Sequence, residues 1–376
     1  MGGVRKHLPD RILEMVASNP WPATLAVPAG VASYRLPEWL TFLSLVPTTA
    51  CMPNGLTLYC NQRFGDAATR CLREGTAAHH LVHAPTADSS NLVAGQDDDL
   101  LANADVAFGQ PAVRGVMRSA RLRWVHLTTA GYERYATEGF RAAMKARGAI
   151  LTTSSLVYSE PVAQHTLAMM LALARKLPAS WEAQWTDRSW QYRPIRAQSV
   201  LLNGQTAVIL GLGAIGRRLI ELLAPFGMNL IAVRTAARGD EPVRTVPQAQ
   251  VEWVLPLADH VISTLPGGDA TRHFMNASRF AAMKPGAIFY NVGRGSTVDQ
   301  ESLLAGLRSG RLSAAYLDVM DPEPLPAEHP LWRAPNCYIT PHTAGGHRDE
   351  QERIVRHFLE NLKRFIAGEA MVDRVT

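Results

Sequence analysis

Residues 206–216 read TAVILGLGAIG in one-letter code. The apolar run Ala207–Leu210 has the length and composition of a buried strand. Glycines follow in the spacing G-x-G-x-x-G, and Ile215 and Leu219 continue at helical spacing. A second apolar run, Asn229–Val233, comes next. The order strand, glycine turn, helix, strand predicts a βαβ unit of a parallel sheet.

The three glycines of this turn have separate tasks. Gly211 permits the tight turn, Gly213 lets the backbone approach a pyrophosphate, and Gly216 lets helix and strand pack closely. Exposed N–H groups at the helix start, around Ala214 and Ile215, then favour phosphate. An ordinary strand-to-helix turn is the alternative, and the full strand–turn–helix–strand context disfavours it. The turn therefore predicts a dinucleotide site.

Strands and helices alternate on both sides of this unit. Further strands are expected after it at 260–264, 287–292, 314–319 and 337–340. Before it, strands are expected at 56–60, 79–82, 106–108 and 122–127. The pattern predicts an α/β chain with two Rossmann-like, doubly wound parallel-sheet domains and an active-site cleft between them.

Three divisions of the chain follow from this pattern. Residues 1–55 are rich in proline without clear periodicity, and are expected to form an N-terminal extension. Residues 56–160 together with 347–376 are expected to form a discontinuous substrate-binding domain, and 161–346 the dinucleotide-binding domain. A strong helix is expected from Glu160 to Arg175 with Pro161 at its start, where the missing N–H costs nothing.

Composition narrows the class of protein. The chain has 376 residues, a net charge of +5 and 47% hydrophobic residues, which suits two folded domains. Its basic residues are scattered, so nucleic acid is not expected as a partner, and no apolar stretch is long enough to span a membrane. Four cysteines without a CxxC pair favour a reducing cytoplasm.

Two residue clusters have competing interpretations. His79, His80 and His83 lack the spacing and the acidic or thiol partners of a metal site, so no metal is expected. The linker after the helix expected at 160–175 contains three tryptophans. They are expected to pack against this linker rather than to line the active site. They are Trp181, Trp185 and Trp190.

The end of the strand after the glycine turn bears on the choice of cofactor. An acidic residue there would bind a ribose hydroxyl, but the sequence has Arg234 and Thr235, with Arg238 close behind. A guanidinium offers a fork of donors suited to a 2′-phosphate. NADP(H) is therefore favoured and NAD(H) remains possible, while a solvated surface charge is the alternative for Arg234.

Several further motifs lie at or just beyond the ends of expected strands, where open α/β sheets bind ligands. With the glycine turn, they make most of residues 100–370 resemble the D-isomer-specific 2-hydroxyacid dehydrogenase family, closest to its glyoxylate/hydroxypyruvate reductase branch. The motifs are Leu265-Pro266, Asn291-Val292-Gly293-Arg294-Gly295, Leu317-Asp318-Val319, Glu323-Pro324 and Thr340-Pro341-His342.

The resemblance implies an oxidoreductase that reduces a small 2-keto acid to the D-2-hydroxy acid. It implies Arg294, Glu323 and His342 as catalytic residues. His342 would donate the proton, Glu323 would favour the imidazolium, and Arg294 would bind the substrate carboxylate. Taken singly, each could instead be a loop or surface residue.

The resemblance also implies supporting residues. Leu265, Pro266 and Val292 would line the cofactor, and Asp318 would accept from the nicotinamide carboxamide. In the first domain, backbone N–H groups of Ala130 and Gly131 would hold the substrate carboxylate, together with Arg294 and His342. A homodimer is implied as well. One departure from the family is Gln164, which stands where a glutamate is common.

Other functions remain open on the same residues. A phosphoglycerate or other 2-hydroxyacid dehydrogenase would share the set, whereas a formate dehydrogenase would pair its histidine with glutamine rather than with Glu323. A nucleotide-sensing corepressor on this fold would bind cofactor without turnover.

Overall fold

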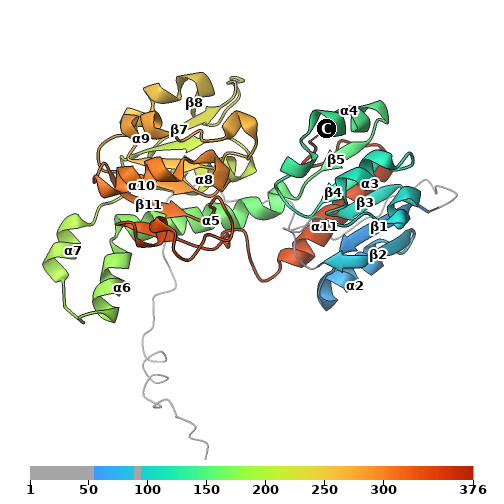
Figure 1. Cartoon of the computed structure of the whole chain (residues 1–376), viewed down its shortest axis with the longest axis horizontal. Coiled ribbons are helices and arrows are strands. Elements are labelled where there is room, and N and C mark those ends of the chain that lie inside the picture. Colours follow the sequence, from blue (N-terminus) through green and yellow to red (C-terminus); the bar gives the residue numbers. More distant parts are fainter. Residues whose placement is uncertain (1–54, 89–94, 376) are drawn as a thin grey trace, which may run out of the picture. The chain divides into compact units, whose positions relative to one another are not determined.

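The computed structural model describes residues 55–88 and 95–375. The expected extension falls on residues outside this range, except for its last position. The described chain contains two parallel sheets, each with helices packed against it (Figure 1). The predicted fold class, two Rossmann-like α/β domains, is confirmed.

The first sheet has five strands in the order β2-β1-β3-β4-β5, and all pairings are parallel. Its strands are β1 (Thr57–Gln62), β2 (His80–Asp88), β3 (Val106–Gly109), β4 (Trp124–Leu127) and β5 (Ile150–Thr152). Its helices are α2 (Asp66–Gly75), α3 (Val113–Arg118), α4 (Glu138–Ala146) and the 3₁₀ helices η2 (Asp99–Asn103) and η3 (Glu133–Tyr135). The strand order reverses direction between β1 and β3. The loops that follow these two strands therefore lie at the carboxyl edge of the sheet, where such folds bind ligands.

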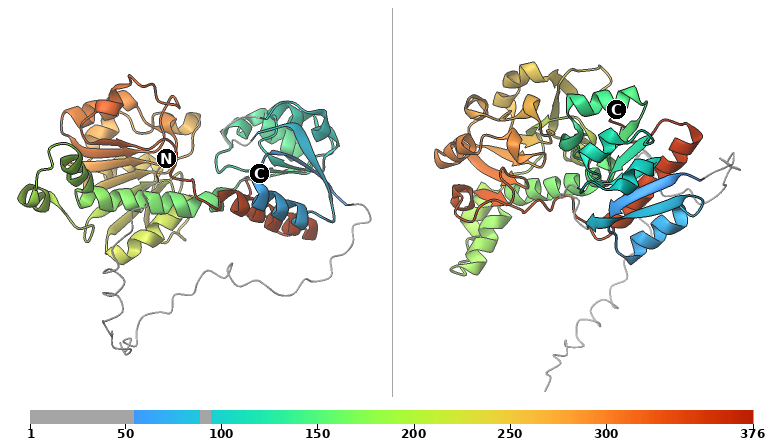
Figure 2. Two further views of the ribbon diagram at one scale, coloured as in Figure 1. Left: turned by 90° about the horizontal axis from the view of Figure 1, so that it is seen from below. Right: turned by 45° about the vertical axis from the view of Figure 1, so that its right-hand side comes forward.

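The last helix of the chain, α11 (Glu350–Ala367), returns to this sheet beside α2 (Figures 1 and 2). Its Phe358 ring stacks on Phe108 at 4.1 Å and on Trp124 at 5.1 Å between centroids. All three rings are almost completely buried, so this aromatic stack fixes the helix on the sheet.

The second sheet has seven parallel strands in the order β12-β11-β10-β9-β6-β7-β8. Its strands are β6 (Thr206–Leu210), β7 (Asn229–Arg234), β8 (Arg244–Pro247), β9 (His260–Ser263), β10 (Ala287–Asn291), β11 (Leu312–Leu317) and β12 (Cys337–Ile339). Its α-helices are α8 (Ala214–Leu223), α9 (Ala277–Ala282) and α10 (Gln300–Arg308). The 3₁₀ helices are η4 (Ala224–Phe226), η5 (Gln248–Trp253), η6 (Leu255–Leu257), η7 (Asp269–Thr271), η8 (Gly295–Thr297) and η9 (Pro330–Arg333). The central strand β6 is the one that leads into the glycine turn.

Apolar layers cover both faces of the second sheet. One layer includes Val208 and Phe289, and the other includes Ile209 and Tyr290, since successive side chains point to opposite faces. Strands buried on both sides read as continuous apolar runs, which is why the sequence predicted the strands of this sheet except β8.

The long helix α5 (Ser155–Ala174) corrects one prediction. It begins at Ser155, so Pro161 lies inside it and not at its start. Proline at the first helical turn is the usual pattern, but here six residues before it also adopt helical geometry. The C-terminal half of α5 packs on α8, with Met170 and Leu173 in the core beneath.

The linker after α5 also differs from expectation. It forms two helices, α6 (Leu177–Trp185) and α7 (Tyr192–Gln198). Trp181, Trp185 and Trp190 are 45%, 76% and 93% exposed, so the expectation that they pack the linker is wrong. No part of the described chain buries these three side chains, whereas Ala183 of α6 is buried.

No helix in the described ranges is long and apolar enough to cross a membrane.

Candidate active site

The glycine turn lies between β6 and α8, and its backbone explains each glycine. Gly211 has φ +100°, in the region that side chains avoid, and its N–H donates to Val233 O at 2.8 Å. A Cβ on Gly216 would lie 2.3 Å from the Gly211 carbonyl oxygen. A Cβ on Gly213 would meet nothing within 4 Å. The first and third glycines are therefore required by the turn itself, whereas Gly213 opens onto free space.

The start of α8 offers donors to a ligand. Gly213 is its N-cap and is exposed, and no side chain caps the helix. Ala214 and Ile215 are half-buried at the first turn. Uncapped N–H groups and the positive end of the helix dipole favour an anion at this place. These residues fit a dinucleotide pyrophosphate.

At the end of β7, Arg234 does not point free into solvent. Its Nη1 donates to Oε1 of Glu241 at 3.2 Å, and the two side chains are 17% and 4% exposed. Glu241 also accepts from the backbone N–H of Arg238 at 2.6 Å and of Gly239 at 2.8 Å. The Arg238 N–H is the strongest of the interactions that lower the pKa of Glu241. Thr235 is exposed.

The ends of β9 and β10 approach each other closely beside the turn. A Cβ on Gly293 would lie 2.4 Å from the carbonyl oxygen of Leu265, so only glycine fits there. Leu265 and Val292 are buried, and Pro266 is exposed. This arrangement brings together the three residues expected to line the cofactor.

Arg294 follows β10 and caps η8. Its Nε donates to Glu133 Oε1 at 2.8 Å, and its Nη1 donates to Gly293 O at 2.8 Å. Its side chain is 32% exposed and that of Glu133 is 37% exposed. The following Gly295 packs directly on the Met320 backbone, since a Cβ there would lie 1.9 Å from the Met320 carbonyl oxygen. This contact places Arg294 beside the loop that carries Glu323.

Glu323 and His342 form a direct pair. His342 Nδ1 lies 2.8 Å from Glu323 Oε2, while Glu323 Oε1 accepts from the Met320 N–H at 2.9 Å. The bond with Glu323 raises the pKa of His342 and outweighs burial, which acts in the opposite direction. Burial raises the pKa of Glu323, but the His342 bond and the Met320 N–H together lower it overall. The pair therefore favours an imidazolium beside a carboxylate.

Asp318 organises the loop that bears His342. Its Oδ1 accepts from Thr340 Oγ1 at 2.6 Å and from Thr343 N–H at 2.9 Å, and the Ala344 N–H lies 3.1 Å from both carboxylate oxygens. The His342 N–H donates to the Asp318 carbonyl oxygen at 2.8 Å. His342 has φ +53°, a backbone conformation that residues other than glycine rarely adopt. The hydrogen bonds to Asp318 hold the loop in this conformation. The Asp318 side chain is thus a support of the loop as well as a candidate ligand of the cofactor.

The loop after β4 carries Ala130 and Gly131, both half-buried. Thr129 Oγ1 donates to the Gly131 carbonyl oxygen at 2.7 Å, and the buried Gln110 Nε2 donates to Oγ1 of Thr128 and Thr129 at 3.1 Å each. A Cβ on Gly131 would lie 1.8 Å from Nη2 of Arg294. The expected carboxylate loop and the expected carboxylate-binding arginine are therefore adjacent.

The departure at Gln164 has a local explanation. Gln164 Nε2 donates to Glu160 Oε1 at 2.6 Å, and Glu160 pairs with Arg218 of α8, whose Nε lies 2.5 Å from Glu160 Oε2. The carboxylate that meets α8 thus comes from one turn earlier in α5.

Two acidic residues of the site were missed by the sequence analysis, namely Glu133 and Glu241. Glu133 lies two residues after Gly131, and this proximity to the expected loop was the only available signal. Glu241 lies seven residues after Arg234, beyond a strand end that was read only for its cationic side chains.

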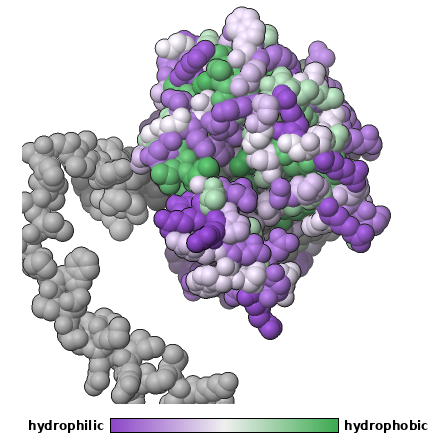
Figure 3. Space-filling view, turned by 90° about the vertical axis from the view of Figure 1, so that its left-hand side faces the viewer, coloured by the Kyte–Doolittle hydropathy of each residue, from purple (hydrophilic) through white to green (hydrophobic). Residues whose placement is uncertain are grey.

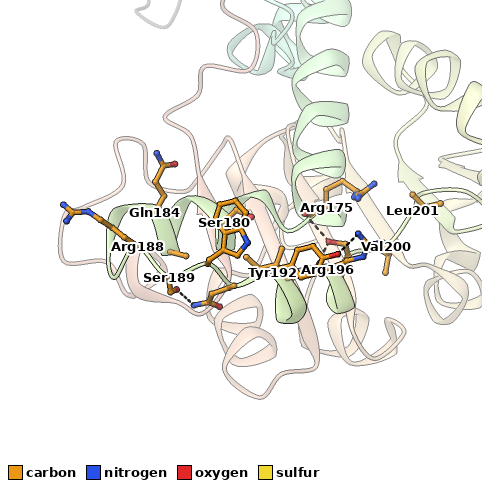
Figure 4. A pocket seen from close by; sticks show the side chains of 14 residues that line it. Arg175, Ser180, Gln184, Arg188, Ser189, Tyr192, Arg196, Val200 and Leu201 are labelled. Atoms are coloured by element: carbon orange, nitrogen blue, oxygen red, sulfur yellow. Dashed lines mark hydrogen bonds between the residues drawn. The ribbon is translucent and has the colours of Figure 1, made fainter.

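Metal ligands do not gather in the described part of the chain, where no group of three or more His, Cys, Asp or Glu could hold an ion. One open pocket of about 1050 Å³ lies elsewhere, between α6 and α7 (Figure 4). Its lining includes Arg175, Arg188, Trp190, Tyr192 and Arg196 and none of the residues expected to act in catalysis. Because none of the glycine-turn residues lines it, this pocket is not the expected dinucleotide site.

Comparisons with known proteins identify relatives of the chain. A sequence profile described as D-isomer specific 2-hydroxyacid dehydrogenase, NAD binding domain, matches residues 167–344. A glyoxylate reductase of Aeropyrum pernix is 35% identical over 227 residues, which make up 59% of this chain and 68% of that protein. A glyoxylate/hydroxypyruvate reductase B of Citrobacter koseri is 31% identical over 252 residues, 64% of this chain and 74% of that protein.

A solved structure shows the same architecture. It is a D-isomer specific 2-hydroxyacid dehydrogenase from Xanthobacter autotrophicus Py2 in complex with NADPH and MES. Its TM-score is 0.71 at 26% identity, covering 86% of this chain and 98% of that chain.

Proposed function

Because the chain belongs to the D-isomer-specific 2-hydroxyacid dehydrogenase family, a family of NAD(P)-dependent oxidoreductases, we propose that it reduces a small glyoxylate- or hydroxypyruvate-like 2-keto acid to the D-2-hydroxy acid. The observation that carries this proposal is the pair of His342 Nδ1 and Glu323 Oε2 at 2.8 Å, with Arg294 on the adjoining loop. An imidazolium held by a carboxylate is suited to protonate the oxygen of a carbonyl under attack.

Each of the three residues has one task. Glu323 holds Nδ1 of His342, which leaves Nε2 to donate the proton to the carbonyl oxygen. Arg294 binds the substrate carboxylate through its terminal nitrogens and polarises the carbonyl. The backbone N–H groups of Ala130 and Gly131 complete the carboxylate site beside Nη2 of Arg294.

The cofactor would be held by the second sheet. Bound NAD(P)H supplies the hydride. Gly211, Gly213 and Gly216, with Ala214 and Ile215 at the helix start, would hold its pyrophosphate. Leu265, Pro266 and Val292 would line its nicotinamide end, and Asp318 would accept from the carboxamide.

NADP(H) is the proposed preference and reduction the proposed direction. Arg234 at the end of β7, with Thr235 and the nearby Arg238, supplies the donors for a 2′-phosphate. Glu241 already accepts from Arg234 Nη1 and from the Arg238 N–H, so a phosphate that binds at Nη1 would compete with this carboxylate.

The proposed domain bounds stay as the sequence suggests them. Residues 56–160 with 347–376 would bind substrate, and 161–346 would bind the dinucleotide. The packing of Phe358 on Phe108 supports the return of the chain to the first domain. The contact of Glu133 with Arg294 supports an active-site cleft between the domains.

A homodimer is proposed through α6 and α7. Trp185, Trp190 and Tyr192 are 76%, 93% and 57% exposed, and apolar patches lie among polar ones on the side of the molecule that carries these helices (Figure 3). Light scattering of the purified protein is expected to give twice the chain mass, and Trp185→Ser with Trp190→Ser to shift it toward the monomer. A monomer at micromolar concentration would refute this part.

Cys60, Cys71 and Cys337 are free thiols, which supports the cytoplasm as location.

The proposed function is tested by following NAD(P)H absorbance with the purified protein. Glyoxylate, hydroxypyruvate, pyruvate and bulkier keto acids are each assayed with NADPH and with NADH. We expect turnover of a small 2-keto acid, faster with NADPH. No turnover with any of them, despite cofactor binding, would refute the enzyme proposal and favour a nucleotide-sensing protein. If NADH is the better cofactor, the proposal on Arg234 fails and the rest stands.

A further inference from the structure

Glu133 reaches from the first domain to two groups that follow strands of the second sheet. It opens η3, two residues after Gly131. Its Oε1 accepts from Arg294 Nε at 2.8 Å and from the Gly267 N–H at 3.3 Å. Gly267 directly follows Pro266, so a single carboxylate oxygen joins the arginine to the loop expected to line the cofactor.

The contacts of Arg294 divide its guanidinium into two ends. Glu133 takes the Nε edge, and one hydrogen of Nη1 is donated to the Gly293 carbonyl oxygen at 2.8 Å. Nη2 lies against Gly131, where a Cβ would approach it to 1.8 Å. The Nη end therefore faces the loop whose amides are the proposed seat of the substrate carboxylate, and only a glycine at 131 leaves room for it.

Stability alone does not explain this pair. Both side chains are about one third exposed, at 32% and 37%, so water screens their attraction. Arg294 nevertheless has a defined direction, because a flexible four-bond side chain is held at Nε and at Nη1. A guanidinium that is already oriented loses less freedom when an anion binds.

We propose that Glu133 is a positioning residue of the reduction: it fixes the Nε edge of Arg294 so that the Nη end meets the substrate carboxylate at Ala130 and Gly131. The inference rests on the proposed function and deepens it. Glu133 then acts through Arg294 and does not touch the reacting atoms. The competing hypothesis is that the Glu133 carboxylate competes with the substrate carboxylate for Arg294 and must be displaced by it.

Two substitutions separate these ideas. Both hydrogen bonds end on Oε1, so the amide oxygen of Glu133→Gln can accept from Arg294 and from Gly267 without the charge. Glu133→Ala removes the acceptor altogether. Positioning predicts that alanine raises the KM for the keto acid about 10-fold while glutamine stays within about 3-fold of the wild type. The KM for NADPH is expected to stay unchanged in both.

The outcomes are measured by steady-state kinetics, with NADPH binding by fluorescence as the check of folding. Glu138→Ala, which removes an exposed carboxylate in the first turn of α4, is the matched control and is expected to behave as the wild type. A lower KM in both Glu133 variants would show that Glu133 competes with the substrate for Arg294, and it would overturn the positioning role. An unchanged KM in the alanine variant, or equal increases in both variants, would also overturn it.

Failure of this inference differs from failure of the proposed function. Wild-type protein without keto-acid turnover refutes the function, whereas active wild type with an indifferent Glu133→Ala refutes only the role of Glu133. If the alanine variant does not bind NADPH, Glu133→Ser provides the same test, because its hydroxyl is too short to reach Arg294.

Discussion

Two arginines were expected to receive anions of ligands, and each is paired with a carboxylate of the chain itself. The partner of Arg294 is Glu133, which lies 161 positions away and is 37% exposed. The partner of Arg234 is Glu241, which lies seven positions away and is 4% exposed. Glu133 engages one edge of its arginine. Glu241 is also held by the N–H groups of Arg238 and Gly239.

We therefore call Arg294 the prepared site, because its Nη end is oriented and directed away from its carboxylate partner. We call Arg234 the occupied site, because a carboxylate of the chain holds one of its terminal nitrogens. At Arg294 the Nη end remains directed at the amide loop, so a substrate carboxylate can bind while Glu133 stays in place. At Arg234 the Glu241 carboxylate holds Nη1 and is stabilised by three donors, so we propose that a 2′-phosphate would compete with it for this nitrogen. The arginine residue alone therefore says less about cofactor preference than its partner does.

The largest expected effect is at the prepared site. Arg294→Ala removes the charge-assisted bonds to the substrate and is expected to lower kcat/KM for the keto acid by at least about 100-fold with either cofactor. The KM for NADPH should change little. Steady-state kinetics with both cofactors measure this, and a similar loss in cofactor binding would show that Arg294 supports the fold of the cofactor loop instead.

A smaller and more selective effect is expected at the occupied site. Arg234→Ala is predicted to lower kcat/KM for NADPH by at least about 10-fold, since a hydrogen bond to a charged group contributes about 1.5–3 kcal/mol. NADH should be nearly unaffected because it has no 2′-phosphate. Equal losses with both cofactors would assign Arg234 to the stability of the loop.

The smallest effect should come from Glu241 and have the opposite sign. Glu241→Gln keeps an acceptor oxygen for one of the two loop N–H groups and removes the charge that competes with phosphate, so kcat/KM for NADPH should rise by about 3-fold. The ratio of NADPH to NADH efficiency is the measurement. A fall in this ratio would mean that Glu241 orients Arg234 for the phosphate. Glu241 would then act on Arg234 as we propose that Glu133 acts on Arg294.

Much of the fold was predictable because strands buried on both faces read as unbroken apolar runs. The turn at Gly211 and the family resemblance were likewise visible, and the comparisons confirm that resemblance. The short edge strands β5 and β8 were missed, as was the true start of α5, because Pro161 has the sequence signature of a helix beginning. The exposure of Trp190 could not be read from its apolar character alone.

In the candidate site, the two arginines and the Glu323–His342 pair were predicted from the sequence, but the carboxylates that pair with the arginines were missed. Arg294, Glu323 and His342 stand in recognisable motifs at strand ends. Glu133 belongs to a loop of the other domain, and its pairing depends on how two sheets place their edges, which no local pattern encodes. The close approach of Gly131 to Arg294 Nη2 has the same origin.

The most direct test of the account is the pH dependence of kcat/KM for keto-acid reduction in the wild type, Glu323→Gln and His342→Ala. The bond with Glu323 raises the pKa of His342, so the protonated donor is present below that raised pKa and is lost as pH rises through it. We predict that the wild-type rate falls over this range, that Glu323→Gln moves the fall to lower pH, and that His342→Ala loses about 100-fold with no such fall. A near-normal rate in His342→Ala would contradict the account, since the proton would then come from another group.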